Sequence, residues 1–195
     1  MKPALIIADM LEDFIRLDGA LPVGEEGFKI IPNIQELIGV CRKNAIPVIY
    51  ANDALMPGDF LFKSRMRPHG IRGSAGARVI SELRPEPSDL IVHKRRFSAF
   101  FKTDLDISLR QWGIDTIVLA GVATEVCVLS TAYDAVCHDF ETIVLADCCA
   151  SRFKETHARV IAVLKRTPVY PLLKVLNLAD FMQTLIQEQG DTVFG

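Results

Sequence analysis

The stretch Asp115-Thr-Ile-Val-Leu-Ala-Gly-Val-Ala-Thr-Glu-Val-Cys-Val-Leu-Ser-Thr131 changes its apolar period halfway along its length. Its first part, Thr116–Ala120, is short, rich in β-branched residues and followed by Gly121, which predicts a buried strand. From Thr124 onward the apolar side chains recur at helical spacing, with Thr124 itself as the expected N-cap. The stretch therefore predicts a strand, a tight turn and a helix, with Cys127 in the first helical turn.

Cys127 is predicted to lie where a helix N-terminus alters the chemistry of a thiol. Unpaired backbone N–H groups and the positive end of the helix dipole favour a thiolate at such a position. A strand, a tight turn and a helix start suit an activated sulfur nucleophile. A small buried cysteine in an ordinary strand-to-helix turn explains the same pattern, so this stretch alone leaves both interpretations open.

Strand-like and helical patterns alternate along the rest of the chain. The other expected strands are Ala4–Ala8, Pro47–Ala51, Asp89–His93, Glu141–Ala146 and a short Pro168–Tyr170. The expected helices are Ile30–Lys43, Ala75–Leu83, Thr103–Trp112, Lys154–Lys165 and Asn177–Gln187, and residues 52–75 form a long irregular loop. This alternation predicts a three-layer, doubly wound α/β fold with a mostly parallel six-stranded sheet, whose expected strand order is 3-2-1-4-5-6. We expect one domain over residues 1–195.

The overall composition limits the classes of partner and compartment. A formal charge of −2 gives no electrostatic footprint for nucleic acid or an anionic membrane. No apolar run approaches the ~20 residues that span a bilayer, and Asp9 comes too early for a signal-peptide core. Five cysteines without a CxxC spacing favour neither a disulfide framework nor a structural zinc site. We therefore expect a cytoplasmic protein that acts on a small molecule, without nucleic-acid or membrane partners.

Four chemically active residues follow or end the first four predicted strands: Asp9, Asp53, Lys94 and Cys127. Ligands of parallel α/β sheets bind beyond the carboxyl ends of the strands, so these residues are expected at one edge. There a carboxylate can accept the thiol proton, and an ammonium can favour the thiolate and hold the carboxylate in place. A structural ion pair of Asp9 and Lys94 under a loop is the plainer alternative.

Three segments of the sequence resemble the isochorismatase-like cysteine hydrolases, the superfamily that includes nicotinamidase and N-carbamoylsarcosine amidohydrolase. The segments are Ile-Ile-Ala-Asp-Met-Leu-Glu-Asp-Phe (6–14), Val-His-Lys-Arg-Arg-Phe-Ser-Ala-Phe (92–100) and Gly-Val-Ala-Thr-Glu-Val-Cys-Val (121–128). They occur in the family's order, and the resemblance extends from residue 4 to about residue 170.

This resemblance implies a catalytic triad of Asp9, Lys94 and Cys127. In the family the cysteine attacks an electrophilic carbon, the aspartate serves as general base and acid, and the lysine supports both. The family's cis peptide would fall between Val122 and Ala123, and it directs the N–H groups of Ala123 and Cys127 toward an oxyanion. With a cysteine present, the resemblance favours cleavage of a C–N bond in a small amide, carbamoyl or ureido compound through a thioacyl intermediate.

The resemblance leaves three other functions open. Nicotinamidases bind a metal through an Asp-x-His pair and a later histidine; here Asp53 and His69 match, but Leu55 replaces the first histidine. A catalytic zinc takes three protein ligands plus water, so we expect no cofactor, with Asp53 and His69 as vestiges of such a site. A metal-dependent nicotinamidase is one alternative. An isochorismatase-type vinyl ether hydrolase and a non-catalytic binding protein on the same fold are the others.

The roles of several further residues stay open at the level of sequence. Phe14, Phe97 and Phe100 are expected either to form the walls of a substrate pocket or to belong to the core. Arginines in and after the long loop can bind a substrate carboxylate or lie in solvent: Arg65, Arg67, Arg72, Arg95 and Arg96. Cys148 and Cys149 are expected to pack near the rim of the site. Members of the family are commonly oligomeric, which implies a homo-oligomer, either a dimer or a tetramer.

Overall fold

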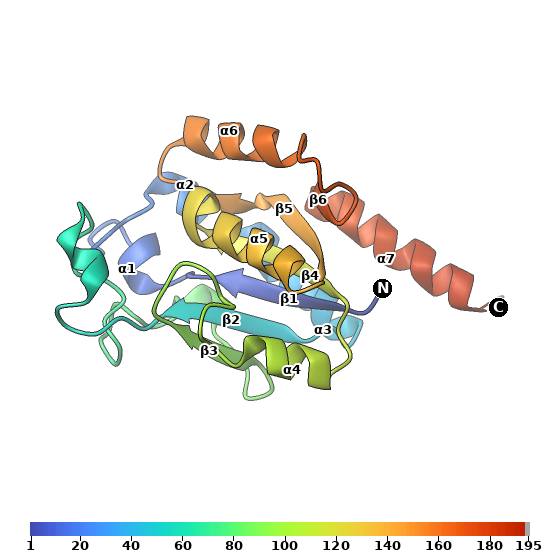
Figure 1. The fold of residues 1–195 in the computed structure, drawn as a ribbon, viewed down its shortest axis with the longest axis horizontal. Helices are drawn as coiled ribbons and strands as arrows, with labels where there is room; N and C mark the ends of the chain where they lie inside the picture. Colours follow the sequence, from blue (N-terminus) through green and yellow to red (C-terminus); the bar gives the residue numbers. More distant parts are fainter. Residues whose placement is uncertain (194–195) are drawn as a thin grey trace.

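A single six-stranded sheet runs through the centre of the molecule in the computed structural model, which describes residues 1–193 and the side chains of residues 1–187 (Figure 1). Its strands are β1 (Pro3–Ala8), β2 (Val48–Asp53), β3 (Leu90–Lys94), β4 (Thr116–Val122), β5 (Glu141–Ala150) and β6 (Leu173–Leu176). The order β3-β2-β1-β4-β5-β6 and the parallel direction of every pairing confirm the predicted doubly wound α/β fold.

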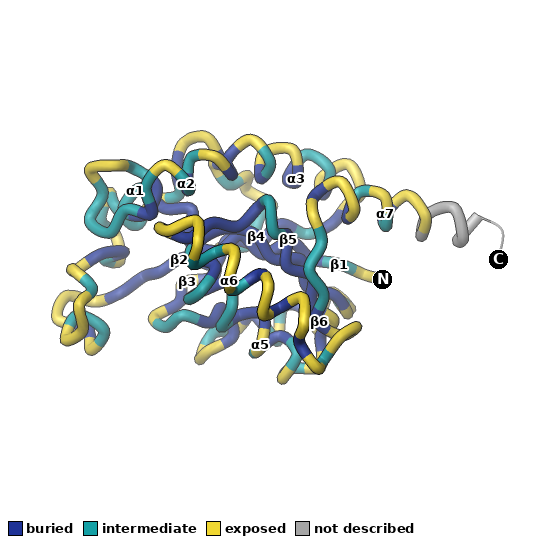
Figure 2. Tube along the Cα trace, turned by 90° about the horizontal axis from the view of Figure 1, so that it is seen from above, coloured by how far each residue is buried: buried dark blue, intermediate teal, exposed yellow. Residues whose placement is uncertain are grey.

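Helices cover both faces of the sheet, as Figure 2 shows with the strands between two helical layers. One face packs against α1 (Glu12–Ile15), α2 (Glu25–Lys29), α3 (Ile31–Lys43) and α7 (Leu178–Val193). The other face packs against α4 (Leu105–Gln111), α5 (Leu129–Cys137) and α6 (Lys154–Leu164). Successive side chains of a strand point to opposite faces, so Ile7 joins the first core and Ile6 the second. Because the central strands are buried on both faces, their sequences read as continuous apolar runs.

Two of the predicted elements are replaced or displaced in the structure. The segment Ala75–Leu83 is mostly a turn with a short 3₁₀ helix, η2 (Ser81–Leu83), because its backbone pairs with the loop after β1: Val79 bridges Leu11, and the Ile80 N–H donates to the Met10 carbonyl at 3.0 Å. The sixth strand is Leu173–Leu176 instead of Pro168–Tyr170, because the earlier residues form turns ahead of the cis peptide bond between Tyr170 and Pro171.

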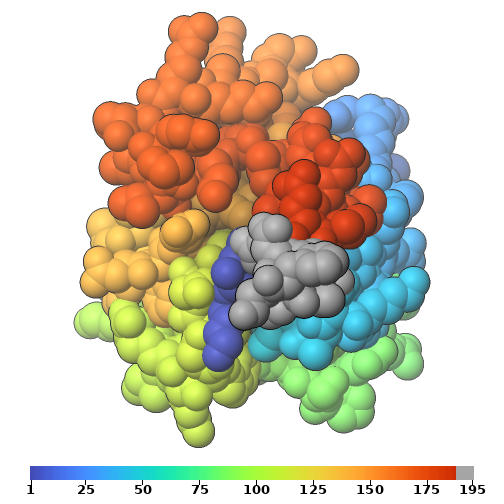
Figure 3. All heavy atoms as spheres, turned by 90° about the vertical axis from the view of Figure 1, so that its right-hand side faces the viewer, coloured from blue at the N-terminus to red at the C-terminus, as the bar shows by residue number. Residues whose placement is uncertain are grey.

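The carboxyl ends of all six strands lie at one edge of the sheet. Figure 3 views the opposite side of the molecule, where the first residues of the chain reach the surface before β1. Among the described residues, none of the helices is long and apolar enough to cross a membrane. Because parallel α/β sheets bind ligands at the carboxyl ends of their strands, a site is expected at the edge where α1, the 52–75 loop and the turn after β4 converge (Figure 1).

Candidate active site

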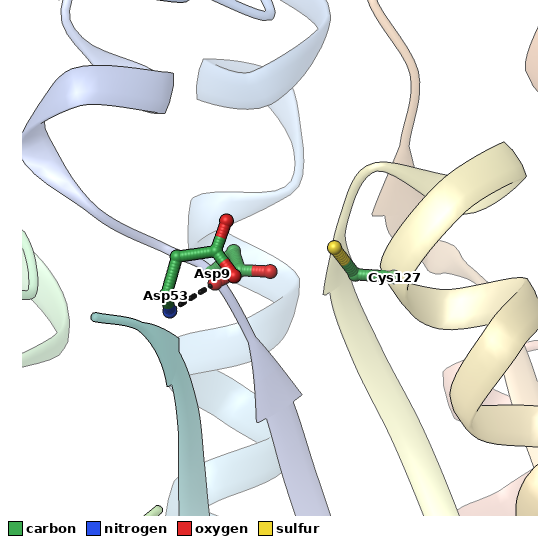
Figure 4. Close-up of side chains that lie close together, drawn as sticks. All are labelled: Asp9, Asp53 and Cys127. Atoms are coloured by element: carbon green, nitrogen blue, oxygen red, sulfur yellow. Dashed lines mark hydrogen bonds between the residues drawn. The ribbon is translucent and has the colours of Figure 1, made fainter. Parts of the chain in front are cut away.

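The carboxyl edge of the sheet brings together the four residues that the sequence placed at strand ends. Asp9 directly follows β1 with a φ of 51°, Asp53 ends β2, and Lys94 ends β3. Cys127 lies in η3 (Thr124–Val128), a π-helical turn between β4 and α5. Figure 4 shows the two carboxylates and the sulfur facing a common space.

Lys94 is the centre of this group and is fully buried. Its Nζ lies 2.7 Å from Asp9 Oδ2, 2.5 Å from Asp53 Oδ1 and 3.5 Å from Cys127 Sγ. The backbone N–H of Asp53 also donates to Asp9 Oδ1 at 2.7 Å, the dashed contact in Figure 4. A buried charge needs a partner and hydrogen bonds, and the register that places Asp53 beside Lys94 on neighbouring strands supplies both.

The turn that carries Cys127 depends on a close approach of two strands. Gly121 has a φ of 110°, and a Cβ at this position would lie 2.1 Å from the carbonyl oxygen of Ala8. Only glycine fits here, so β4 passes directly against the end of β1 beside Asp9. The peptide bond between Val122 and Ala123 is cis, at the position that the resemblance named.

The predicted N-cap role of Thr124 is wrong. Thr124 lies inside η3, where the residue before the turn, Ala123, has extended backbone and makes no side-chain cap. The hydroxyl of Thr124 instead lies 2.9 Å from Nδ1 of His157 on α6. Glu125 accepts a 2.5 Å hydrogen bond from Ser151 Oγ, which ties the start of the turn to the end of β5.

Burial and charge set the protonation of the group. Desolvation, reinforced by the charge of Asp53, raises the pKa of Asp9 to about 6, although Lys94 acts in the opposite direction. Desolvation and the carboxylate of Asp9 also raise the pKa of the Cys127 thiol well above its ordinary value, against the lowering effect of Lys94. Burial alone would lower the pKa of Lys94, but Asp9, Cys127 and Asp53 hold it well above its usual range. Burial and the charge of Asp9 therefore act against the thiolate that the turn after β4 led us to expect, whereas the ammonium of Lys94 favours it.

A cavity of about 220 Å³ opens above these side chains. Asp9, Asp53 and Cys127 form part of its lining, and most of the remaining wall is apolar. Its other lining residues are Phe14, Leu21, Pro22, Val23, Met66, His69, Phe97, Val122, Ala123, Glu125, Val126 and Arg152. A small apolar pocket with a few convergent polar groups is the usual form of a small-molecule site.

The structure distinguishes the aromatic and arginine candidates that line the cavity from those that lie elsewhere. Phe14 and Phe97 line the cavity as expected, but Phe100 does not: it is buried in the second core and stacks on His138 with ring centroids 5.0 Å apart. Its ring also lies 5.8 Å, centroid to centroid, from that of Phe140 in the same core. Arg95 and Arg96 pair with the buried carboxylate of Asp59.

Other candidates take places that the sequence did not indicate. Arg72 lines a separate surface cavity, whereas Arg65 and Arg67 border a cavity beside the candidate site. Arg152, which sequence reasoning missed, reaches the site because β5 runs four residues beyond its predicted end at Ala146. Cys148 and Cys149 are buried in the cores, and Cys149 Sγ lies 3.7 Å from the Leu119 carbonyl oxygen.

The residues around Asp53 do not fit a catalytic zinc. Asp53 Oδ2 and His69 Nε2 lie 3.8 Å apart, but Asp53 Oδ1 is bonded to Lys94 and the buried Leu55 supplies no donor. Ligand atoms of Asp9, Asp53 and Cys127 lie within 4.8 Å of one another, yet the Lys94 ammonium is in contact with all three residues. Asp53 and His69 alone offer two protein donors, fewer than the three that a catalytic zinc needs.

The fold and the site define a class of protein: a doubly wound α/β protein with a buried cysteine, aspartate and lysine below a small pocket. Residues 3–174 match the isochorismatase domain, and the chain belongs to the isochorismatase family of hydrolases.

Three solved structures show how similar the chain is to members of this family. An isochorismatase-like hydrolase from Alkaliphilus metalliredigens is 36% identical with a TM-score of 0.87, over 95% of this chain and 100% of that one. N-carbamoylsarcosine amidase from Thermoplasma acidophilum is 34% identical with a TM-score of 0.80, over 91% and 97%. Nicotinamidase PncA from Bacillus subtilis is 30% identical with a TM-score of 0.83, over 91% and 100%.

Proposed function

We propose that this protein is a cysteine-dependent amidohydrolase that cleaves a C–N bond of a small amide, carbamoyl or ureido compound. The observation that carries the proposal is the buried ammonium of Lys94, which contacts Asp9, Asp53 and Cys127 together at the floor of the cavity. The similarity to an amidase that acts on a carbamoyl compound supports the same reaction class.

The first step transfers a proton and forms a C–S bond. Because the pKa of Asp9 is about 6, its side chain is a carboxylate at pH 7 and can accept the proton of the Cys127 thiol. The sulfur electron pair then attacks the carbonyl carbon, and the C=O π pair moves to the oxygen. Backbone N–H groups of Ala123 and Cys127, on the cavity wall, are the proposed donors to this oxyanion.

The second step breaks the C–N bond. The oxyanion re-forms the carbonyl, and the nitrogen leaves with the proton that Asp9 took from sulfur, so an amine or ammonia departs. The product on the enzyme is a thioester, or a thiocarbamate when the substrate is a ureido compound. Water then attacks this carbon with Asp9 again as base, and Cys127 leaves as a thiol after proton return.

Lys94 stays protonated throughout this sequence. Its ammonium balances the charge of Asp9 and lies 3.5 Å from Cys127 Sγ, where it stabilises the thiolate that forms during attack. Asp53 holds the ammonium from the other side at 2.5 Å. Lys94 is therefore held in place by two carboxylates that lie at the ends of two different strands.

We also propose that the reaction needs no metal, because the donor set at Asp53 and His69 lacks a third protein ligand. His69 has a structural role that accounts for its burial: its Nδ1 lies 2.6 Å from the Arg67 carbonyl oxygen, and its ring contacts Phe14 and Phe62 edge-on. Nicotinamide hydrolysis through a metal-bound substrate is consequently the weaker reading of the site.

Ammonia release from a panel of small amides and ureido compounds, nicotinamide included, tests the proposal. Turnover of a carbamoyl or ureido compound after chelator treatment is the expected result. Turnover restricted to nicotinamide and dependent on added zinc or manganese would contradict it. The Cys127→Ala protein is the matched control for background hydrolysis.

A further inference from the structure

A surface cavity of about 340 Å³ lies beside the carboxyl end of the edge strand β3, and we call it the basic cavity. Among the residues that the structure describes, its lining holds four permanent cations, an imidazole and a phenyl ring, and no carboxylate: Arg72, His93, Arg95, Arg96, Phe101 and Lys102. None of these residues lines the cavity above Cys127. The basic cavity is therefore a separate hollow and not an extension of the candidate active site.

The end of β3 and the turn after it contribute to both cavities. Lys94 contacts the residues at the floor of the candidate active site, and Phe97 lines the cavity above them. His93, Arg95 and Arg96 line the basic cavity. Successive side chains of a strand point to opposite sides, so the strand that places Lys94 inside places His93 at the surface. One short stretch of chain thus positions residues of two different sites.

Asp59, which does not line the basic cavity, holds two of its cations in place. The Asp59 side chain is fully buried and accepts hydrogen bonds from Arg95 Nη2 at 2.6 Å and Arg96 Nη1 at 3.2 Å. A guanidinium group has five N–H donors, so each arginine keeps N–H groups that no residue of the described chain engages. Because these groups are already fixed on one side, they lose little freedom when they bind an anion on the other.

The remaining permanent cations of the basic cavity have no acidic partner. Arg72 and Lys102 are exposed, and neither forms an ion pair with any of the residues that the structure describes. Lys102 Nζ lies 5.7 Å from the centre of the Phe101 ring. Four cations therefore meet one carboxylate, that of Asp59, on a chain whose formal charge is −2. Such a local excess of positive charge attracts anions.

The set of donors in the basic cavity suits phosphate better than carboxylate. A carboxylate has one charge and two acceptor oxygens, whereas a phosphate ester has about −1.5 to −2 charges at pH 7 and three acceptor oxygens. Two linked phosphates match several guanidinium groups more closely still. The half-exposed ring of Phe101 adds an aromatic face to the lining, on which a nucleobase can stack.

We propose that the basic cavity binds a small molecule that carries a diphosphate group, such as a nucleoside diphosphate. The phosphates contact Arg72, Lys102 and the N–H groups that Asp59 leaves free on the two other arginines. A base packs on Phe101. The site does not depend on the proposed reaction, because the two cavities share no lining residue.

Titration calorimetry on the wild-type chain tests the site, with pyrophosphate, ADP and adenosine as probes in a buffer free of divalent metal. Pyrophosphate and ADP are expected to bind with a Kd below about 1 mM, and adenosine is expected not to bind. Raising the ionic strength from about 0.05 to about 0.5 M should weaken the binding of both. Tighter binding of ADP identifies a nucleotide as the ligand, and equal binding identifies the diphosphate group alone. A higher Kd for both, or binding that is independent of salt, contradicts the proposal.

A charge variant connects the binding to this cavity. Arg72→Gln combined with Lys102→Gln is expected to raise the Kd of pyrophosphate at least about tenfold. Both side chains are exposed and unpaired, so their replacement leaves the fold intact, and thermal unfolding of the variant checks this. Arg95 and Arg96 are kept, because their removal would leave the buried carboxylate of Asp59 without a partner.

The matched control is Arg65→Gln combined with Arg67→Gln, which removes the same charge beside a different cavity. This control is expected to keep the wild-type Kd for pyrophosphate. Phe101→Ala is expected to remove any advantage of ADP over pyrophosphate. Pyrophosphate binding that survives the loss of Arg72 and Lys102, or that weakens equally in the control, would overturn the proposal.

Discussion

Lys94 and Asp53 stand opposite each other at the ends of two neighbouring strands, and the ammonium of one lies 2.5 Å from the carboxylate of the other. The same ammonium lies 2.7 Å from Asp9. Asp53 is thus as close a partner of Lys94 as Asp9 is. The site is best understood as a group of four residues in which Asp53 sets the charge around the base and the nucleophile.

The first prediction concerns the nucleophile. Cys127→Ala is expected to abolish ammonia release, by at least about 10³-fold, because the proposed C–S bond can no longer form. The side chain is small and the change creates little empty space, so the circular dichroism spectrum and thermal unfolding should be close to those of the wild type. Substantial activity in this variant would exclude a covalent mechanism through Cys127.

The second prediction concerns the base and its effect on stability. Asp9→Asn is expected to be inactive, because an amide cannot accept the thiol proton. In the folded protein the pKa of Asp9 is about 6, above the ordinary 3.8 of an unfolded chain, so the ionised group disfavours folding. The resulting loss of folding stability develops as the pH rises from about 4 to about 6.

It follows that the Asp9→Asn protein should not be less stable than the wild type near neutral pH. Its free energy of unfolding is expected to be higher by about 1 to 3 kcal/mol at most. Thermal unfolding at about pH 7.5 and about pH 5 should show a larger advantage at the higher pH. A variant that is destabilised at both values would show that the charge of Asp9 strengthens the fold through Lys94.

The third prediction is the acid limb of the pH profile. Because Asp9 must be ionised to act as a base, kcat/KM is expected to fall as the pH drops through about 6. In Asp53→Asn the neighbouring negative charge that raises the pKa of Asp9 is removed, so the limb should move to lower pH. An unchanged limb in Asp53→Asn would mean that another group controls it.

The fourth prediction concerns the buried ammonium. Lys94→Met leaves the buried side chains of Asp9 and Asp53 without their shared counter-charge. Removing one partner of a buried charged group costs about 3 to 5 kcal/mol, so denaturant unfolding should shift strongly to lower concentration. Combining Lys94→Met with Asp9→Asn and Asp53→Asn is expected to restore much of the stability but no activity. Wild-type stability in Lys94→Met alone would contradict this reading of the group.

The fifth prediction concerns metals. The purified protein is expected to keep its activity after treatment with a chelator, because Leu55 supplies no ligand between Asp53 and His69. Elemental analysis should find well below one equivalent of zinc or manganese per chain. Near-stoichiometric metal together with activity lost to the chelator would be the contrary result.

The sequence predicted the sheet order and the positions of Asp9, Lys94 and Cys127 because these depend on strand ends, which long apolar runs mark well. It misplaced β6, since Leu173–Leu176 is interrupted by Lys174 and lies after a cis proline whose turn no periodicity reveals. The end of β5 was set too early for the same reason, because Asp147 breaks the apolar run although the strand continues to Ala150.

The protonation of the site could not be predicted from the sequence, for a different reason. A helix start predicts a lowered pKa for Cys127, but the actual value depends on how deeply the sulfur is buried and on two carboxylates from other strands. The partnership of Asp53 with Lys94 had a visible signal, since both end neighbouring strands at matching register. Arg152 had none, because its place depends on the true end of β5.

The raised pKa of the Cys127 thiol has a consequence for the working life of the protein. Peroxides and other oxidants attack cysteine mainly as the thiolate, and sulfinic and sulfonic acids formed in this way are not readily reversed. Because burial raises the pKa of the Cys127 thiol, the neutral form that such oxidants attack slowly is favoured between turnovers. The burial that raises the pKa of the Cys127 thiol therefore also protects the sulfur against oxidation.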